Sequence, residues 1–563
     1  MKKILVLVLT TLTIFTLSAC GSKSGSKKDG TTNSTSNSTN KIISKAKQEI
    51  VFNLGAEPKT IDPQLNDGSA GANVINNMYE GLVRQDKSGK FVPAGATSWK
   101  ISKDNLTYTF KLRKNAKWSD GKSVTASDYK YAWLRGVSPS LAADYAYQFY
   151  YIKGAKAYNY KKGKKADVGI KVLDKYTLQV TLAQPTAYFL GLTAMGPYMP
   201  VRADMVKKDP DTWSQNPKEN ITDGPFIMTK HKLNSEIILT PNPYYWNKNN
   251  VRIKTLDFKM LVDLSTALVA YDNNKLSITG LPVQDIVKRK IEDPTFHALP
   301  MLGDYYYDFN INVKPLNKID VRKALSLAID REKIVKNITK ASQLPATGFV
   351  PFGIKKSNGK DFRKTNGDYG VSIKAKVKEA QALLAKAGYP NGKGFPDLTI
   401  SYNTGKGHKS IAEAIQSMWK KNLGIHVKLQ NEEWAVFLSK RTHEDFQIAR
   451  EGWIADYSDP MTFLDLFASY SANNDTGWKP GINGENPDSK IFNKLITEAK
   501  SLKASPKRDE DMSKAEKILH DSYVTMPIYY YTGIDLIKAN VHNWTVNSFG
   551  VWYFGDSYIE AKK

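Results

Sequence analysis

Residues 118–128 read Trp-Ser-Asp-Gly-Lys-Ser-Val-Thr-Ala-Ser-Asp, and the patterns around this stretch indicate the class of fold. Residues 106–112 (LTYTFKL) before it and residues 176–182 (YTLQVTL) after it alternate between apolar and polar side chains. A period of two is typical of β-strands that bury one face. Residues 50–54 (IVFNL) predict a further strand, which is followed by a turn through Glu57-Pro58.

Helical patterns appear in the second half of the chain. Residues 374–387 carry Ala and Leu at helical spacing and stop at Gly388, a residue type that commonly ends helices. Ser410 and Glu413 have the spacing of a capping box, which predicts a helix from Ser410 to about Gly424, before a strand at 425–429. Strands and helices mixed along the chain predict an α/β protein with mixed sheets.

Length and composition indicate a large globular protein. The chain has 563 residues, which is too long for one ordinary domain and predicts two or three lobes. Hydrophobic residues make up 41% and aromatic residues 11%, which is enough for substantial cores. The 30 Tyr and 11 Trp also include the residue types that line clefts for varied ligands.

The formal net charge is +26, or +24 without Lys2 and Lys3. The lysines are scattered, and no recognition helix, RNP motif or zinc finger accompanies them, so we expect no nucleic-acid partner. A solvated cationic surface attracted to an anionic cell envelope explains the charge better. A cationic surface adhesin stays an alternative function.

The sequence has no pattern that predicts an enzyme. The seven His residues form no HExxH or paired ligand spacing, and there is no GxSxG elbow or Walker loop. The single cysteine, Cys20, excludes an intrachain disulfide and a thiolate metal site. We therefore expect no catalysis, no cofactor and no metal.

The N-terminus has the features of a secretory signal. A basic start, Met1-Lys2-Lys3, precedes the apolar run 4–17, which is too short for a comfortable transmembrane helix. Leu17-Ser18-Ala19-Cys20 resembles the lipobox of bacterial lipoproteins, which implies that residues 1–19 are removed and that Cys20 carries a lipid. An ordinary secreted protein is the alternative. Residues 20–47 then form a tether, because 21–41 contain almost no apolar side chain and should stay flexible.

Several motifs together resemble the peptide-binding branch of the extracellular solute-binding proteins of ABC importers (family 5), particularly the oligopeptide-binding lipoproteins. Residues 118–128 match the family pattern "WSDG..VTA.D". The other motifs that fit, in the same order, are Thr60–Pro63, Tyr79–Leu82, Asn242–Trp246, Asp320–Leu325 and Pro527–Tyr531. The matches run from about residue 50 nearly to the C-terminus.

The resemblance implies an α/β fold of the periplasmic-binding-protein-like type II, with two hinged lobes and an extra inserted lobe. Lobe I would comprise 48–79, 223–305 and 532–563, lobe II the insertion 80–222, and lobe III 306–531. The chain would cross between lobes I and III twice, and these crossings would form the hinge. The protein would be a monomer at the extracellular face of the cell membrane that captures short peptides and delivers them to the permease of an ABC importer.

The stretch Arg450–Pro460 (REGWIADYSDP) resembles the family segment that forms one wall of the ligand cleft. The resemblance implies that Asp456 pairs with the α-ammonium group of a peptide. A fixed carboxylate can accept a charge-assisted hydrogen bond from such a compact cation. Alternatively, Asp456 caps a turn before Asp459-Pro460.

Main-chain groups on two segments should pair with the ligand backbone as added strands do, which is blind to side-chain identity. The first segment is Gly452, Trp453 and Ile454, and the second is Asp67, Gly68 and Ser69. Both glycines suit a close approach, and each could instead serve a turn.

Further side chains match family positions around the cleft. Trp434 and Trp453 would line side-chain pockets, with Tyr145 or Tyr147 from lobe II, although all four could be core residues. Arg441 and Arg450 could meet a peptide carboxylate, or could form structural ion pairs. His408, in a loop similar to one in the family, and Tyr531, at the end of the last motif, complete the set of expected ligand-binding residues.

Two features depart from the family pattern. Glu451 stands where a small residue is expected, and the loop 472–487 (ANNDTGWKPGINGENP) is longer than expected. Both bear on the ligand preference. A dedicated signal peptide, or a nickel chelate, haem or a sugar in a related fold, therefore stays open as the ligand.

Overall fold

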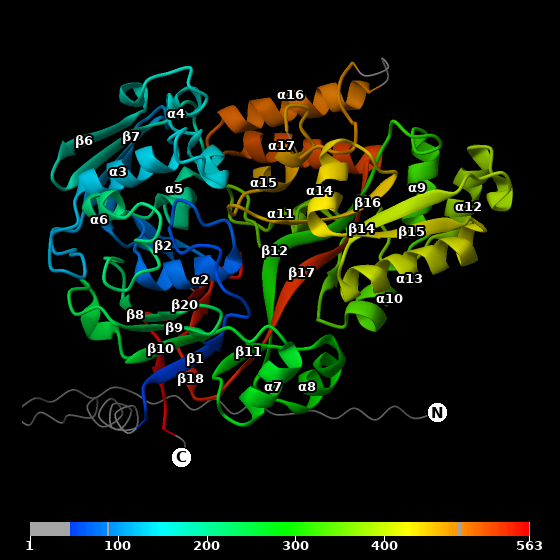
Figure 1. The fold of residues 1–563 in the computed structure, drawn as a ribbon. Coiled ribbons are helices and arrows are strands. Elements are labelled where there is room, and N and C mark those ends of the chain that lie inside the picture. The colour runs from blue at the N-terminus through cyan, green and yellow to red at the C-terminus, as the bar shows by residue number, and fades with distance from the viewer. Residues whose placement is uncertain (1–45, 87–88, 472, 482–485, 562–563) are drawn as a thin grey trace, which may run out of the picture.

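Two long antiparallel strands, β12 (Phe296–Phe309) and β17 (Thr525–Ile537), run side by side through the middle of the molecule (Figure 1). The computed structural model describes residues 46–86, 89–471, 473–481 and 486–561. The predicted signal, Cys20 and nearly all of the tether lie outside these residues. Figure 1 shows one body of the molecule on either side of the upper part of this strand pair.

β12 and β17 belong to one large mixed sheet. Its strands, in spatial order, are β15 (Val427–Glu432), β14 (Leu398–Asn403), β16 (Ile448–Ile454), β12, β17, β11 (Ile278–Gly280), β1 (Glu49–Asn53), β10 (Thr255–Lys259), β9 (Glu236–Pro241) and β8 (Phe226–Lys232), with β13 (Leu344–Pro345) beside β17. The pairing of β12 with β17 is irregular between Pro300 and Asp304. Residues 303–309 of β12, beyond this irregularity, also pair with β16.

A second, four-stranded antiparallel sheet lies within the segment 80–222. It consists of β4 (Ala96–Ile101), β5 (Thr107–Leu112), β7 (Thr177–Thr181) and β6 (Ile170–Asp174), in that order. The two strands predicted from alternation are thus β5 and β7, which pair with each other. Two-stranded ribbons add β2 (Val83–Gln85) with β3 (Phe91–Pro93), β18 (Val541–His542) with β21 (Tyr558–Ile559), and β19 (Thr545–Val546) with β20 (Trp552–Tyr553).

The stretch 118–128 forms a tight turn that leads into helix α3 (Ala126–Gly136). The Trp118 N–H donates to the Lys122 carbonyl at 2.8 Å, and Gly121 takes a positive φ of 86° that glycine adopts without strain. The Thr125 N–H donates to the Asp128 carboxylate at 2.7 Å, which satisfies a free donor at the helix start. Trp118 is buried in the core, so the motif has a structural role.

Helices cover both sheets. The helices before β12 are α2 (Ser69–Met78), α3, α4 (Ala155–Asn159), α5 (Phe189–Leu192), α6 (Ala203–Lys208), α7 (Leu264–Asp272) and α8 (Ile286–Glu292). Those after it are α9 (Ile319–Leu327), α10 (Arg331–Lys333), α11 (Phe362–Asn366), α12 (Val377–Lys386), α13 (Lys406–Leu423), α14 (Trp434–Thr442), α15 (Met461–Leu464), α16 (Pro487–Ser501) and α17 (Pro506–Ser522). Within the described ranges, no helix is long and apolar enough to cross a membrane.

The helix predicted from Ser410 starts earlier than expected. α13 begins at Lys406, so Ser410 and Glu413 lie inside the helix and the predicted start was wrong. A capping-box spacing also occurs by chance inside helices, where apolar periodicity decides the length. The predicted end is confirmed, because Gly424 caps α13 with a φ of 71°.

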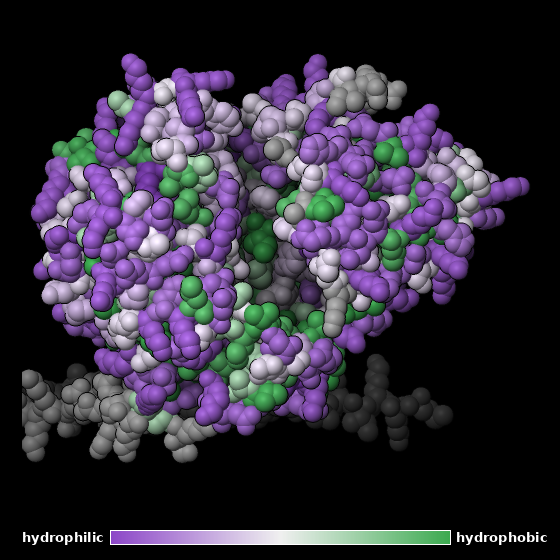
Figure 2. Space-filling model, viewed as in Figure 1, coloured by the Kyte–Doolittle hydropathy of each residue, from purple (hydrophilic) through white to green (hydrophobic). Residues whose placement is uncertain are grey.

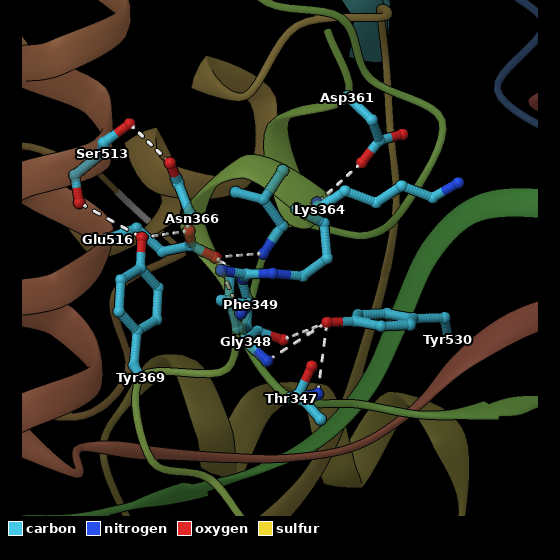
Figure 3. A network of polar contacts seen from close by, with 12 residues as sticks. Thr347, Gly348, Phe349, Asp361, Lys364, Asn366, Tyr369, Ser513, Glu516 and Tyr530 are labelled. Atoms are coloured by element: carbon cyan, nitrogen blue, oxygen red, sulfur yellow. Dashed lines mark hydrogen bonds and ion pairs between the residues drawn. The ribbon is translucent and has the colours of Figure 1, made fainter.

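A polar network fixes the segment 347–371, which contains α11, against α17 (Figure 3). The fully buried carboxylate of Glu516 pairs with Arg363 and accepts backbone N–H groups from Phe349 at 3.1 Å and Val350 at 2.9 Å. The Tyr369 hydroxyl donates to it at 2.9 Å. The hydroxyl of Tyr530, on β17, donates to the Gly348 carbonyl at 2.9 Å, so the segment is also tied to the central strand pair.

Candidate binding cleft

A cavity of about 280 Å³ lies where four stretches of the chain meet. They are residues 66–85, 191–199, 454–458 and 545–553, with single contributions from Phe91 and Tyr145. Six of the expected site residues line it: Asp67, Gly68, Ser69, Tyr145, Ile454 and Asp456. Figure 2 shows a groove between the two bodies, with apolar residues exposed inside it.

Asp456 follows β16 and lies at the wall of the cavity, partly buried. Its backbone N–H donates to Thr462 Oγ1 at 3.1 Å, which fixes the main chain there. Its carboxylate receives a long hydrogen bond of 3.4 Å from the hydroxyl of Tyr147. Burial raises the pKa of Asp456 to about 6, and the nearby side chains of Gln148 and Tyr147 offset this only in part. Its charged form is therefore poorly compensated.

Tyr145 and Tyr147 lie on a 3-10 turn, η1 (Asp144–Phe149), that faces Asp456 from the segment 80–222. Their rings pack edge to face, 5.7 Å apart. Burial raises the pKa of Tyr145 to about 12, with smaller contributions from the charges of Asp456 and Asp67. Tyr145 is therefore close to both carboxylates that line the cavity.

Gly68 precedes α2, and its backbone is extended, with φ −111° and ψ 149°. A Cβ at Gly68 would meet no atom within 4 Å, so the fold itself leaves open space there. Its carbonyl accepts the N–H of Ala72 at 3.0 Å, the first bond of the helix. Because Gly68 has no side chain with which to cap, the first N–H groups of α2 keep their capacity to donate.

β16 has an open edge beside the cavity. β14 pairs with β16 only at Ile448 and Ala449, and no other described strand covers the rest of that side. The Ala455 N–H donates to the Leu302 carbonyl on the β12 side at 2.8 Å. Because backbone groups alternate along a strand, those of Ile454 and Gly452 are directed to the open side.

Gly452 is required by close packing. A Cβ at Gly452 would lie 2.3 Å from the hydroxyl of Tyr531 and 3.3 Å from Arg450 Nη2. Any larger residue at position 452 would therefore push the side chain of Tyr531, on β17, away from β16.

Arg450, Tyr531 and His408, three of the residues expected to bind the ligand, lie close to one another. Arg450 donates to the Tyr531 hydroxyl at 3.2 Å and to Asn403 Oδ1 at 3.2 Å, and none of the described carboxylates lies within ion-pair distance of it. Burial, with a smaller contribution from Arg450, lowers the pKa of His408 to about 4. His408 is therefore neutral near pH 7, and Arg450 supplies the positive charge of this group.

Arg441 has a different environment from Arg450. It pairs with Glu451 and, at 2.9 Å, with Asp475; both carboxylates are buried, and Arg441 is partly buried. Arg441 thus joins the two departures from the family pattern: it pairs with Glu451 and with Asp475, which belongs to the loop 472–487. Burial raises the pKa of Glu451 to about 7, and Arg441 partly counteracts this.

The two tryptophans lie outside the wall of the cavity. Trp434 opens α14 with 47% of its surface exposed and packs near Phe437. Trp453 packs partly against the core, and its Nε1 donates to Thr462 Oγ1 at 3.2 Å.

Sequence reasoning missed much of the cavity wall. Residues 191–199 and 545–553 carry no motif that indicates a binding role, because their contribution is apolar surface and turn geometry. Gln148, next to Tyr147 in the sequence, could have been found from its place in a predicted cleft segment.

Comparison with known proteins places the whole chain among binding proteins. The family model for bacterial extracellular solute-binding proteins, family 5 (Middle), matches residues 90–475. The oligopeptide-binding protein OppA of Bacillus subtilis is 37% identical over 563 residues, which covers 98% of this chain and 99% of the relative.

Solved structures give the same result. The Haemophilus influenzae OppA complex with the peptide RPPGFSPFR is similar with a TM-score of 0.75 and 32% identity, covering 91% of this chain and 99% of that chain. Listeria monocytogenes OppA bound to peptide has a TM-score of 0.74 and 31% identity, with 91% and 99% covered.

Proposed function

Because the chain belongs to family 5 of the bacterial extracellular solute-binding proteins, we propose that it captures short peptides and delivers them to the permease of an ABC importer. The observation that carries this proposal is Asp456. It is a partly buried, poorly compensated carboxylate at the wall of a cavity. Such a group gains most from a ligand that brings a positive charge.

The peptide's amino group would bind Asp456. An α-ammonium group supplies three donors, and a charge-assisted hydrogen bond to a buried carboxylate is stronger than one at the surface. Tyr145 and Tyr147 face this position from the opposite wall, so they would enclose the bound amine.

The peptide backbone would pair with the open edge of β16 at Gly452 and Ile454. The opposite wall offers the N–H groups around Asp67, Gly68 and Ser69. Main-chain pairing does not depend on side-chain identity, which suits a receptor for many sequences.

Arg450 would meet the peptide's carboxylate, directly or through water, with Tyr531 and His408 beside it. Arg441 is a weaker candidate for this role, because Glu451 and Asp475 already neutralise it. Trp434 and Trp453 would contact side chains of the peptide at the rim.

We propose that the lobes divide as the sequence predicts, with lobe I at 48–79, 223–305 and 532–563, lobe II at 80–222 and lobe III at 306–531. β12 and β17 would then be the two crossings of the hinge. The irregular pairing between Pro300 and Asp304 supports a bend at that level, since β-irregularities locally weaken the ladder. Closure would surround the ligand and expel water.

We also propose attachment to the outer face of the membrane through lipid on Cys20, with residues 20–47 as the tether. Metabolic labelling with a fatty acid tests this. The wild-type protein should incorporate label, and Cys20→Ala should not incorporate it and should appear in the medium. Equal labelling of both proteins would contradict the proposal.

Calorimetry with a free and an N-acetylated peptide tests the Asp456 contact. Removing one partner of a buried charge pair costs about 2–5 kcal/mol, so acetylation or Asp456→Ala should weaken binding by at least about 30-fold. Asp521→Ala, an exposed change on α17, should leave the affinity unaltered. Equal affinities for both peptides would overturn the assignment.

Native mass spectrometry of the purified protein tests the ligand class. A mixture of short peptides released on gentle denaturation supports broad capture, and one defined peptide supports a dedicated signal receptor. A haem, a nickel chelate or an empty cleft with heparin binding would contradict the proposal. We propose that the protein is not an enzyme, since its relatives are named as binding proteins.

A further inference from the structure

The cavity beside Asp456 lies where a bound peptide would begin. A hydrogen bond from the α-ammonium group to the carboxylate is about 2.8 Å long, and the N–Cα bond adds about 1.5 Å. The first Cα of the peptide would therefore lie within about 4 to 5 Å of Asp456. Its side chain would start at the edge of the cavity that Asp456, Ile454 and Tyr145 line.

Later residues of the peptide would leave this cavity. Pairing with β16 takes the peptide from Ile454 toward Gly452, and each residue advances by about 3.3 Å. Ile454 lines the cavity, whereas Gly452 and Trp453 are not part of its wall. Only the first side chain thus has direct access to it.

The wall of the cavity is mainly apolar. Its larger apolar side chains include Ile75, Val83, Phe91, Met195, Met199 and Phe549. Its volume equals about nine water molecules at about 30 Å³ each, which is ample for a large side chain.

Apart from Asp456, most polar side chains of the wall already have partners, although the buried Nη1 of Arg84 has no hydrogen-bond partner among the described residues. Arg84 pairs with Glu80 at 2.7 Å and stacks on Tyr553 at 3.6 Å, and Asp67 pairs with Lys59 at 3.1 Å. The side chains of two asparagines are used as well, because Asn76 donates to the Trp552 carbonyl at 3.0 Å and Asn547 accepts two backbone N–H groups. Apart from this one Arg84 nitrogen, a polar or charged side chain of the peptide would find few free partners there.

We propose that this cavity receives the first side chain of the peptide and selects peptides that begin with a large apolar residue such as Leu, Met or Phe. The proposal rests on the proposed function, because it needs the amino group to be bound at Asp456. It adds a preference at one position of the ligand, while the remaining positions stay unselective.

Calorimetry with a matched tripeptide series tests the preference. Burying a Leu side chain in an apolar site should make Leu-Ala-Ala bind about tenfold to hundredfold more tightly than Gly-Ala-Ala. The isomer Ala-Ala-Leu has the same composition and should bind at least about fivefold more weakly than Leu-Ala-Ala. Equal affinities for the three peptides would overturn the inference and leave peptide capture intact, whereas no binding of any of them would overturn the proposed function itself.

A cavity-filling variant locates the preference. Ala72 lies on α2 and lines the cavity, and Leu is a good helix former, so Ala72→Leu should fill the space without breaking the helix. The ratio of affinities between Leu-Ala-Ala and Gly-Ala-Ala should fall below about threefold. The matched control is Ala70→Leu, on the same helix but away from the cavity wall, which should keep the wild-type ratio. An unchanged ratio in folded Ala72→Leu, with folding checked by thermal unfolding, would place the preference elsewhere and contradict the inference.

Discussion

Glu516 and Asp456 are two carboxylates withdrawn from bulk solvent, and they differ in how their charge is compensated. Glu516 is fully buried and has an arginine, two backbone N–H groups and a tyrosine hydroxyl around it (Figure 3). Asp456 has the distant Tyr147 hydroxyl and the neighbouring Gln148, and no described cation lies within ion-pair distance of it.

The difference is the one expected between a structural carboxylate and a carboxylate that binds a charged ligand, as we propose for Asp456. A fully satisfied buried network rigidifies the fold, whereas an uncompensated charge is costly until a partner arrives. If Asp456 binds an amine as proposed, the favourable charge interaction would form only with the ligand, whereas Glu516 already has its partners in the folded protein.

The largest expected effect is on stability, when Glu516, the carboxylate with a full set of partners, is removed. Glu516→Ala leaves the buried Arg363 without its partner, and breaking such a pair should lower the free energy of unfolding by about 3–5 kcal/mol. Urea unfolding measures this. Glu510→Ala on the same helix removes an exposed pair with Lys514 and should leave the free energy of unfolding nearly unchanged. A similar loss in both variants would remove the distinction between the two kinds of carboxylate.

Asp456→Asn should have the opposite sign in the protein without ligand. The folded pKa of about 6 lies above the unfolded value of about 3.9, so the ionised group costs stability at pH 7 and costs nothing below pH 4. The variant should be more stable by about 1–3 kcal/mol at pH 7, and the gain should vanish at pH 4. Burial also raises the pKa of Asp535 to about 6, so Asp535→Asn should show the same gain in stability at pH 7 and the same loss of that gain at pH 4. Destabilisation of Asp456→Asn at pH 7 would show that the carboxylate is compensated after all.

Peptide affinity should depend on pH through the same group. Below about pH 6 the empty protein holds Asp456 protonated, so affinity should fall about tenfold per pH unit there. Above about pH 8 the α-ammonium group deprotonates, which lowers affinity again. Calorimetry between pH 5 and pH 9 should therefore give a maximum between these limits. The acidic limb should be missing in Asp456→Asn, and its persistence there would assign it to another group.

The smallest effect is expected from the weak contact that Asp456 already has. The hydrogen bond from Tyr147 is 3.4 Å long, so Tyr147→Phe should change peptide affinity by less than about threefold. The same titration measures it, with wild-type protein as the reference. A loss of tenfold or more would mean that the tyrosine hydroxyl contacts the ligand itself.

The sequence predicted the α/β class and the local elements well where periodicity was strong. β5 and β7 were visible as alternating strands, and α12 (Val377–Lys386) as a helix that stops before Gly388. The start of α13 was missed, since four further residues extend it toward the N-terminus. Local patterns are weakest at such ends.

The candidate site was predictable in part, through motifs. Residues around Asp67 and Asp456 are nearly 400 positions apart, and a family resemblance, not spacing, suggested that they share one cleft. The apolar wall from 191–199 and 545–553 could not be predicted, because apolar side chains in a core and in a cavity look alike in a sequence. The contrast between Arg441 and Arg450 also needed coordinates, since it depends on where the 472–487 loop places Asp475.

The pairing of β12 with β17 has a mechanical consequence. Because the two strands are hydrogen-bonded to each other along most of their length, they behave as one ribbon that can flex but cannot let one half slide past the other. If the lobes close as proposed, the two walls of the cleft would then come together in the same alignment each time, whichever peptide is bound. A permease that recognises the outer surface of the closed protein would meet the same shape each time, so its docking would not depend on the bound peptide.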